Sequence, residues 1–256
     1  MLKIGAQMYT IRDYCKSPEA IIESLKKLAA MGYRWVQYSG CAPIDPTLMR
    51  KTCEELGLEV VITHTPYDRI IGDTDAVIAQ HKEMGCGYIG LGSMPDFARG
   101  DVAGLTRFFE EMAEPVEKIH AAGLRFGYHN HSFEFVKLEG QLLFDRMLDR
   151  FPADKWGIIM DTYWVQHGGA DIYQWIEKTA GRLYCVHLKD MAMRLEGGQK
   201  MAAVGEGNLN FPAILPAFEA AGAEYAFVEQ DDCHGEDPFV CLERSLRYLR
   251  SLEYTE

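Results

Sequence analysis

Short apolar runs alternate with longer amphipathic segments along all 256 residues of the chain. Each short run is rich in β-branched or aromatic residues and is apolar on both faces, which is typical of a strand buried in a parallel sheet. The pattern therefore predicts eight strands. They lie at 2–9, 34–38, 58–64, 88–92, 124–130, 156–161, 183–188 and 225–230.

The segments between the strands carry the start and stop signals of helices. Ser17 and Pro18 supply a cap residue and a proline at the first helical position, and Gly32 marks the end of the same segment. Apolar residues such as Ile21 and Leu25 recur between them at helical spacing. Further helices are predicted at 46–56, 74–84, 102–122, 211–221 and 238–252.

Eight alternations of strand and helix, with no break in composition, point to a closed (β/α)₈ TIM barrel that uses residues 1–256 as a single domain. A doubly wound open sheet is the structural alternative, but no G-x-G-x-x-G motif follows the first strand. Gly197-Gly198, between the last two strands, predicts a mobile loop there.

The charge balance limits the classes of partner. The chain carries 26 Lys+Arg against 38 Asp+Glu, which gives a formal net charge of −12. This opposes binding to nucleic acid or to an anionic membrane, because both depend on Lys and Arg. No stretch approaches the roughly 18 apolar residues of a membrane span, and seven cysteines without a C-x-x-C pair indicate reduced thiols. We therefore expect a cytoplasmic protein.

Ionisable residues gather at the ends of the last four predicted strands. Because the carboxyl ends of barrel strands meet at one face, these side chains should converge. Carboxylate oxygens combined with imidazole nitrogen suit Mn²⁺, Mg²⁺, Co²⁺ or Zn²⁺. The sequence therefore predicts a divalent metal site. The residues at these strand ends are His129 and His131, Asp161, His187 with Lys189, and Glu229.

Each of these residues taken alone has a plainer explanation. Asp161 could cap the following helix, His187 could bond a backbone carbonyl, and Glu229 could begin a solvated acidic loop. Their coincidence at the same depth of neighbouring strands favours the metal site, because three unrelated side chains have no reason to align.

Other residues near the predicted strand ends are candidates for substrate binding. Arg12 suits a carboxylate, a phosphate or a pair of sugar hydroxyls, or is a surface arginine. Trp164 is either core packing or a flat platform for a sugar ring. Glu206, between two glycines, belongs by default to a tight loop, with substrate contact as the alternative. The predicted substrate-binding residues are Gln7, Arg12, His64, Trp164, Lys189 and Glu206.

The motifs GYHNHSFEF, MDTYWVQHGG, CVHLKD, VGEGNLNF and FVEQDD, in this order and spacing, resemble the xylose isomerase-like TIM barrel family of sugar-phosphate isomerases and epimerases. The resemblance implies one divalent ion, commonly manganese, with Asp161, His187 and Glu229 as ligands. Many relatives have a glutamate where this chain has His129. Either His129 binds the metal or Glu134 reaches back from the following loop, and we favour Glu134 because such sites normally carry two glutamates.

The resemblance also implies proton transfer next to a carbonyl through a metal-stabilised enediolate. Glu229 and Glu134 would move the proton, or a carboxylate would act together with His129 or His131. The predicted function is a divalent-metal-dependent isomerase or epimerase of a small-molecule sugar, sugar phosphate or keto-sugar. A lyase that acts on inosose or 3-keto glycosides through the same enediolate is the alternative.

Two weaker alternatives come from other classes of protein. An AP-endonuclease-like DNA repair protein shares this barrel but needs extra histidines for three zinc ions. Here Trp164 stands where a D-x-x-H motif needs its histidine, and residues 191–204 contain none. A non-catalytic sugar-binding subunit is the other alternative. Relatives are often dimers or tetramers, so a homo-oligomer is also considered.

Overall fold

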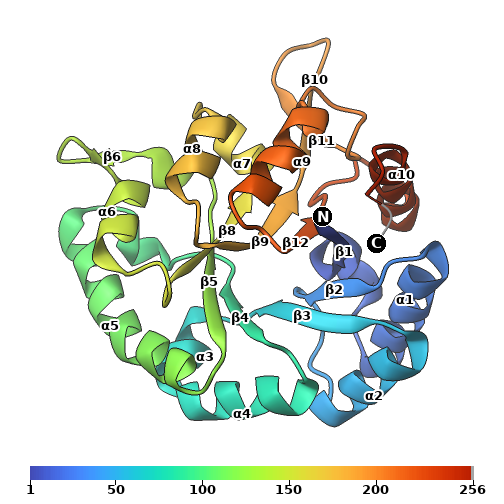
Figure 1. The fold of residues 1–256 in the computed structure, drawn as a ribbon, viewed down its shortest axis with the longest axis horizontal. Coiled ribbons are helices and arrows are strands. Elements are labelled where there is room, and N and C mark those ends of the chain that lie inside the picture. Colours follow the sequence, from blue (N-terminus) through green and yellow to red (C-terminus); the bar gives the residue numbers. More distant parts are fainter. Residues whose placement is uncertain (255–256) are drawn as a thin grey trace.

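Eight parallel strands close into a barrel in the computed structural model, which describes residues 1–254 (Figure 1). Around the barrel the strands follow the order β1-β12-β9-β8-β5-β4-β3-β2, and β2 pairs with β1 to close it. The predicted (β/α)₈ barrel is confirmed, and every predicted strand is present within two residues at each end. The barrel strands are β1 (Lys3–Gln7), β2 (Trp35–Tyr38), β3 (Glu59–His64), β4 (Tyr88–Leu91), β5 (Arg125–His129), β8 (Gly157–Asp161), β9 (Leu183–Leu188) and β12 (Tyr225–Val228).

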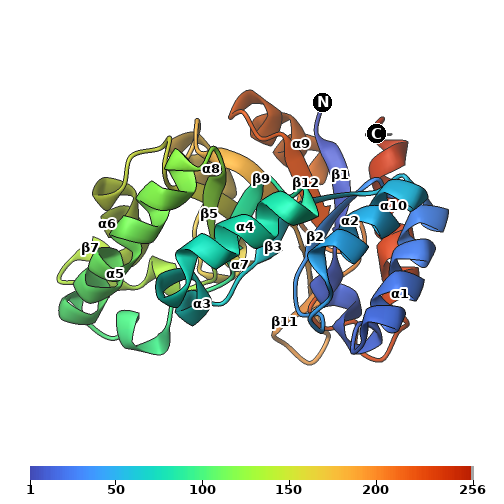
Figure 2. The ribbon, with the colours of Figure 1, turned by 90° about the horizontal axis from the view of Figure 1, so that it is seen from below.

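Helices surround the strands on the outside of the barrel, as Figures 1 and 2 show. Three short 3₁₀ helices, η1 (Met8–Tyr14), η2 (Asp96–Ala98) and η3 (Phe133–Phe135), follow β1, β4 and β5. The α-helices are α1 (Pro18–Met31), α2 (Pro46–Leu56), α3 (Tyr67–Gly72), α4 (Thr74–Met84), α5 (Val102–Ala121), α6 (Leu143–Arg150), α7 (Thr162–His167), α8 (Ile172–Lys178), α9 (Phe211–Ala220) and α10 (Pro238–Ser251).

The helix boundaries follow from local chemistry where the sequence marks them. Ser17 Oγ accepts a hydrogen bond from the Ala20 N–H at 3.2 Å, and Gly32 ends α1 with a φ of +100°. The sequence pattern left α3, α6, α7 and α8 unassigned. These helices have only six to eight residues, too few to show helical spacing, although Asp161 and Asp171 cap α7 and α8.

The segment after β9 corrects one prediction. A mobile loop was expected around Gly197-Gly198, but the chain forms an antiparallel hairpin of β10 (Asp190–Met193) and β11 (Gln199–Ala202). The two glycines form its turn with φ values of +95° and +81°. Figure 2 places this hairpin at the opposite end of the barrel from the N-terminus, and therefore at the carboxyl ends of the strands. A second small hairpin joins β6 (Lys137–Leu138) to β7 (Gln141–Leu142).

Asp190 holds the segment that follows this hairpin. Its buried carboxylate accepts the N–H groups of Gly205 at 2.9 Å, Gly207 at 2.8 Å and Leu209 at 3.2 Å. A Cβ on Gly207 would lie 2.3 Å from Asp190 Oδ1, so only glycine permits this approach. The carboxylate therefore fixes the backbone on both sides of residue 206.

Large apolar side chains fill the barrel interior beneath the carboxyl ends of the strands. Ile62, Ile159, Cys185 and Phe227 belong to this buried cluster. Phe227 packs so close to β1 that a Cβ on Gly5 would lie 2.5 Å from its ring. The polar residues at the strand ends thus stand on a packed apolar layer, as in other barrels of this kind.

No helix within residues 1–254 is both long and apolar enough to span a membrane. The expected cytoplasmic location stays a prediction.

We expect Phe227→Ala to lower the free energy of unfolding by about 3–5 kcal/mol, because a fully buried ring is replaced by a cavity. Urea denaturation followed by circular dichroism measures the change. Leu195→Ala, on the fully exposed hairpin tip, is the control and should change it by less than about 0.5 kcal/mol. Equal effects of the two substitutions would contradict the packed interior.

Candidate metal centre

Four buried side chains converge at the carboxyl ends of neighbouring strands. They are His129 at the end of β5, Asp161 at the end of β8, His187 on β9 and Glu229 directly after β12. One ligand atom from each lies within 4.8 Å of the others, and each side chain is at most 4% exposed. The predicted convergence is therefore confirmed for Asp161, His187 and Glu229.

The register of the barrel brings these residues to the same depth. Asp161 pairs directly with His187 across β8 and β9. The Glu229 N–H donates to the Leu188 carbonyl at 3.2 Å, which continues the pairing of β12 with β9. His129 approaches from β5, on the other side of β8, and its Nε2 lies 3.1 Å from Asp161 Oδ2. The cluster is therefore arranged by strand pairing rather than by flexible loops.

Hydrogen bonds on the outer side of each imidazole leave the inner nitrogen free for a ligand. The Gly92 carbonyl can only accept, so His129 Nδ1 carries a proton and donates to it at 3.0 Å. Gln37 Oε1 accepts from His187 Nε2 at 2.8 Å in the same way. His187 Nδ1 then lies 2.7 Å from Glu229 Oε2 and has no hydrogen-bond partner of suitable geometry. Acceptors of this kind orient metal-binding histidines.

These residues fit a divalent metal ion. Two carboxylates and two imidazoles form a mixed oxygen and nitrogen set that suits several divalent metals. A buried polar atom without a partner costs about 1–3 kcal/mol, and a cation bound by His187 Nδ1 would remove that cost. The cluster could therefore hold one ion through His129, Asp161, His187 and Glu229.

Lys189 is buried beside the cluster and compensates its negative charge. Its Nζ lies 3.1 Å from Asp161 Oδ2, 2.9 Å from Glu229 Oε2 and 2.9 Å from Asp231 Oδ2. Burial alone would lower the pKa of Lys189, but the three carboxylates outweigh burial and raise it. Burial would raise the pKa of Asp161, but Lys189 and His129 lower it well below its ordinary value. Asp161 is therefore ionised, as cation binding requires.

Asp161 serves two purposes that the sequence presented as alternatives. Its Oδ1 accepts the Trp164 N–H at 3.0 Å and caps α7. Its Oδ2 faces His129 and Lys189 in the cluster. One carboxylate thus starts a helix with one oxygen and offers the other to a cation.

A cavity of about 250 Å³ opens above the cluster. Of the predicted substrate-binding residues, His64 and Lys189 line it. His131 lines it as well, with its ring stacked on Phe133 and its Nδ1 unpartnered. Burial and the neighbouring His129 lower the pKa of His131 to about 3, so this imidazole is neutral at pH 7. The cavity is lined by Tyr9, Ser39, His64, Gly92, Ser93, His129, His131, Lys189, Glu229 and Asp231.

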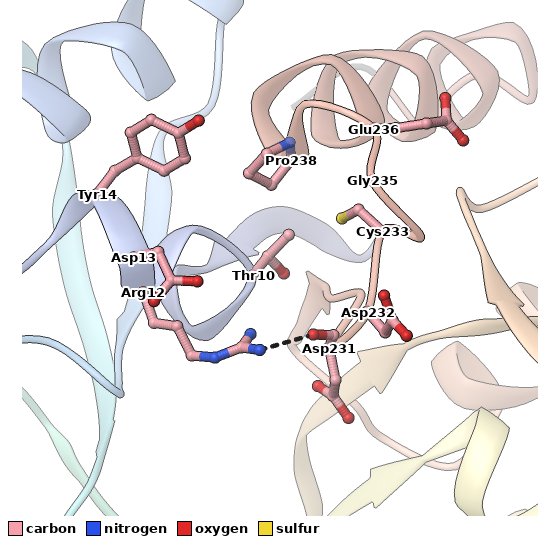
Figure 3. A pocket seen from close by; sticks show the side chains of 10 residues that line it. All are labelled: Thr10, Arg12, Asp13, Tyr14, Asp231, Asp232, Cys233, Gly235, Glu236 and Pro238. Atoms are coloured by element: carbon pink, nitrogen blue, oxygen red, sulfur yellow. Dashed lines mark hydrogen bonds between the residues drawn. The ribbon is translucent and has the colours of Figure 1, made fainter.

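Arg12 and Gln7 lie next to this cavity rather than in its wall. The Arg12 guanidinium donates to the backbone carbonyls of Tyr9 and Asp231, at 2.9 Å each, and lines a neighbouring cavity of about 340 Å³ (Figure 3). Asp231 belongs to both cavities. Gln7 is fully buried, and its Oε1 accepts the Tyr9 N–H at 3.1 Å. Both residues thus support the wall instead of forming it.

Trp164 and Glu206 are not among the residues that line this cavity. Trp164 packs beside His131, with ring centroids 5.3 Å apart, behind the residues that line the cavity. Glu206 forms an ion pair with Arg244 of α10 at 2.7 Å and does not line the cavity. The tight loop expected by default is present, because Gly205 and Gly207 both donate to Asp190. Substrate contact by Glu206 stays a prediction.

Glu134 does not join the cluster, which corrects the preferred ligand from the fifth strand. Its Oε1 accepts from Tyr128 Oη at 2.6 Å and its Oε2 accepts the His131 N–H at 2.8 Å. His129, the alternative, holds the position in the cluster. Strand geometry explains the difference, because His129 ends β5 with its side chain inside the barrel, whereas Glu134 lies five residues later in η3.

Two polar residues of the site were missed in the sequence. Gln37 lies within β2, and a buried amide between apolar neighbours was the available signal. Asp231 follows Glu229 by two residues, so the alternation of extended chain predicts that they share a side. Burial and the charge of Glu229 raise the pKa of Asp231 to about 7.

Comparisons with known proteins identify relatives of this chain and the family of its fold. The chain is 21% identical over 276 residues to an inosose dehydratase of Geobacillus thermodenitrificans (strain NG80-2), covering 89% of this chain and 88% of that protein. Its fold matches that of a sugar phosphate isomerase/epimerase from Parabacteroides distasonis ATCC 8503, with a TM-score of 0.85 and 23% identity over 100% of this chain and 96% of the other. An L-ribulose 3-epimerase shares the fold with a TM-score of 0.76 and 18% identity, over 99% and 95% of the two chains. Residues 25–252 match the family described as xylose isomerase-like TIM barrel, and the chain belongs to that family.

Proposed function

We propose that the protein is a divalent-metal-dependent enzyme that isomerises or epimerises a sugar or keto-sugar by proton transfer next to a carbonyl. The observation that carries this proposal is the buried convergence of His129, Asp161, His187 and Glu229 at the base of an open cavity. Similar proteins described as an inosose dehydratase, a sugar phosphate isomerase/epimerase and an L-ribulose 3-epimerase support the same class of chemistry.

A divalent ion held by these four residues would supply a Lewis acid that polarises the substrate carbonyl. Lys189 places a second positive charge at the base of the cavity, held there by Asp161, Glu229 and Asp231. Negative charge that develops on the oxygen of an enediolate would be stabilised by this ammonium group. The side chain is already in place, so little reorganisation accompanies the reaction.

Glu229 and His131 are the proposed proton carriers. They come from β12 and β5, which β8 and β9 separate in the barrel, so they approach the cavity from different sides. Burial would raise the pKa of Glu229, but Lys189 and His187 outweigh burial and lower it, so the carboxylate is ionised. His131 is neutral and has a free Nδ1. Either group can remove the proton from carbon and return the same proton to the neighbouring carbon, which isomerises the sugar. Return to the opposite face, which epimerises it, requires the other group to have taken up a proton from solvent first.

The second candidate function is that of a lyase, which the inosose dehydratase relatives favour. The first step is the same removal of a proton from the carbon beside the carbonyl. If His131 removes that proton, it becomes protonated and can pass the same proton to the hydroxyl on the next carbon, which leaves as water while a carbon–carbon double bond forms. Both functions use the same residues and differ in whether a carbon–oxygen bond breaks.

Asp161→Asn should abolish tight metal binding while leaving the fold intact. Asparagine still caps α7, but a charged ligand is lost, so we expect the affinity for Mn²⁺, Co²⁺ or Zn²⁺ to fall more than about tenfold. Metal analysis after dialysis and the shift in melting temperature on adding each ion measure this. Asp171→Asn is the matched control, because Asp171 caps α8 in the same way, outside the cluster. Equal metal binding by both variants would remove Asp161 from the ligand set.

A panel of ketoses, inososes and 3-keto glycosides, incubated in deuterated water with Mn²⁺, should show exchange at the carbon beside the carbonyl. Exchange without loss of mass indicates an isomerase or epimerase, and loss of water indicates a lyase. His131→Asn should slow either reaction by about 10²–10⁴-fold with the metal retained, whereas His120→Asn, an exposed histidine of α5, should have no effect. An unchanged rate in His131→Asn would exclude His131 as a proton carrier.

A further inference from the structure

Glu134 is a buried carboxylate that the proposed reaction does not use. It lies in η3 with no exposed surface and does not line the cavity. Burying an ionisable group is costly unless strong interactions compensate. The interactions that compensate the burial of Glu134 therefore indicate its role.

The two oxygens of Glu134 join the residues on either side of His129. Oε1 accepts from the side chain of Tyr128, and Oε2 accepts from the backbone of His131. The carboxylate thus spans the point where β5 ends and the chain leaves the barrel. We call this pair of hydrogen bonds the Glu134 bridge.

The Glu134 bridge acts where strand pairing stops. The last pairing of β5 with β8 is at His129, and the Asn130 N–H reaches the Ile159 carbonyl only at 3.4 Å. The next N–H, that of His131, has the Glu134 carboxylate as its partner. The bridge therefore replaces the neighbouring strand for the residues that carry His129 and His131 into the site.

The surroundings of Glu134 bring the pKa of its carboxyl group close to neutral pH. The titratable or charged side chains that act on it are Tyr128 and Arg99, the latter from the segment after β4, whereas His131 contributes only its backbone N–H. The Arg99 guanidinium stacks on Phe133 at 4.1 Å and donates to the Met94 carbonyl at 2.7 Å. Burial raises the pKa of Glu134 to about 7, although the hydrogen bond from Tyr128 opposes the rise.

We propose that Glu134 is a positioning residue: through the Glu134 bridge it holds His129 in the ligand set and His131 at the cavity wall. The inference rests on the proposed metal site and proton transfer. It assigns Glu134 neither a bond to the metal nor a proton from the substrate. The geometry of the bridge, rather than its charge, is what the site needs.

Two substitutions distinguish the hydrogen bonds of the Glu134 bridge from the negative charge of the carboxylate. In Glu134→Gln the amide oxygen still accepts the His131 N–H, and the NH₂ group donates to Tyr128 Oη, so the bridge survives without a carboxylate. Glu134→Ala removes both bonds. We expect Glu134→Gln to keep metal affinity and exchange rate within about threefold of the wild type, and Glu134→Ala to lose at least about tenfold in affinity.

Metal binding is measured on metal-free protein titrated with Co²⁺ or Mn²⁺ alone, so no substrate is required. Absence of binding by the wild type would defeat the proposed function itself. If the wild type binds and Glu134→Ala binds equally well, the bridge has no positioning role. If Glu134→Gln fails as badly as Glu134→Ala, the charge is essential and Glu134 is a ligand or a base after all.

Tyr128→Phe guards against a folding defect in Glu134→Ala. It removes one bond of the bridge and keeps the buried ring, so its metal affinity should fall between those of the wild type and Glu134→Ala. Glu110→Ala, on the exposed side of α5, is the matched control. Wild-type affinity in a folded Tyr128→Phe would contradict the role of the Tyr128 bond.

The pH dependence of stability gives an independent measurement. A carboxyl whose pKa rises from 4.5 to about 7 on folding favours the folded state at low pH, and this contribution is lost as pH rises through 7. The amide of Glu134→Gln does not titrate. The melting temperature of Glu134→Gln relative to the wild type should therefore rise between pH 5 and pH 8. Parallel profiles would contradict the buried placement of the carboxyl.

Discussion

The parallel register of β8, β9 and β12 is the constraint on which the site depends. It sets Asp161 beside His187 and brings Glu229 to the same depth. The negative charges of Asp161 and Glu229 repel each other strongly in a buried site. The strands therefore hold these side chains in an arrangement that they would not adopt alone. Lys189 relieves part of that repulsion, and a divalent ion between the inward-facing atoms would relieve the rest. Strand pairing in the closed barrel thus keeps the two carboxylates close together despite their repulsion.

The outer acceptors complete this support. A histidine can bind a cation only through a nitrogen that has lost its proton, and the backbone of Gly92 and the side chain of Gln37 decide which nitrogen that is. Gln37 comes from β2 and precedes His187 of β9 by 150 residues in the sequence. The candidate metal centre therefore draws on both halves of the chain, although its four candidate ligands all come from the second half.

Much of the fold could be predicted because the relevant signals are local. Buried parallel strands are apolar on both faces, and α1 begins at Ser17-Pro18 and ends at Gly32, so strands and marked helices were predicted closely. The helices α6 to α8 are too short to show helical spacing, although Asp161 and Asp171 cap α7 and α8. The hairpin around Gly197-Gly198 could not be predicted without knowing how its flanking residues pair. The site residues, too, were predicted only where the signal was local. Asp161, His187 and Glu229 end their strands, whereas the choice between His129 and Glu134 depended on where the chain turns after β5, which spacing alone does not determine.

The carboxylate of Asp190 has a consequence for the rim of the barrel. By gathering the amides of Gly205, Gly207 and Leu209, it fixes the path of a surface loop from within the protein. The side chain at position 206 takes no part in shaping its own backbone and instead pairs with Arg244 of α10. A protein engineer could therefore change this exposed residue with the loss of one surface ion pair, while the path of the loop and the four clustered side chains stay in place.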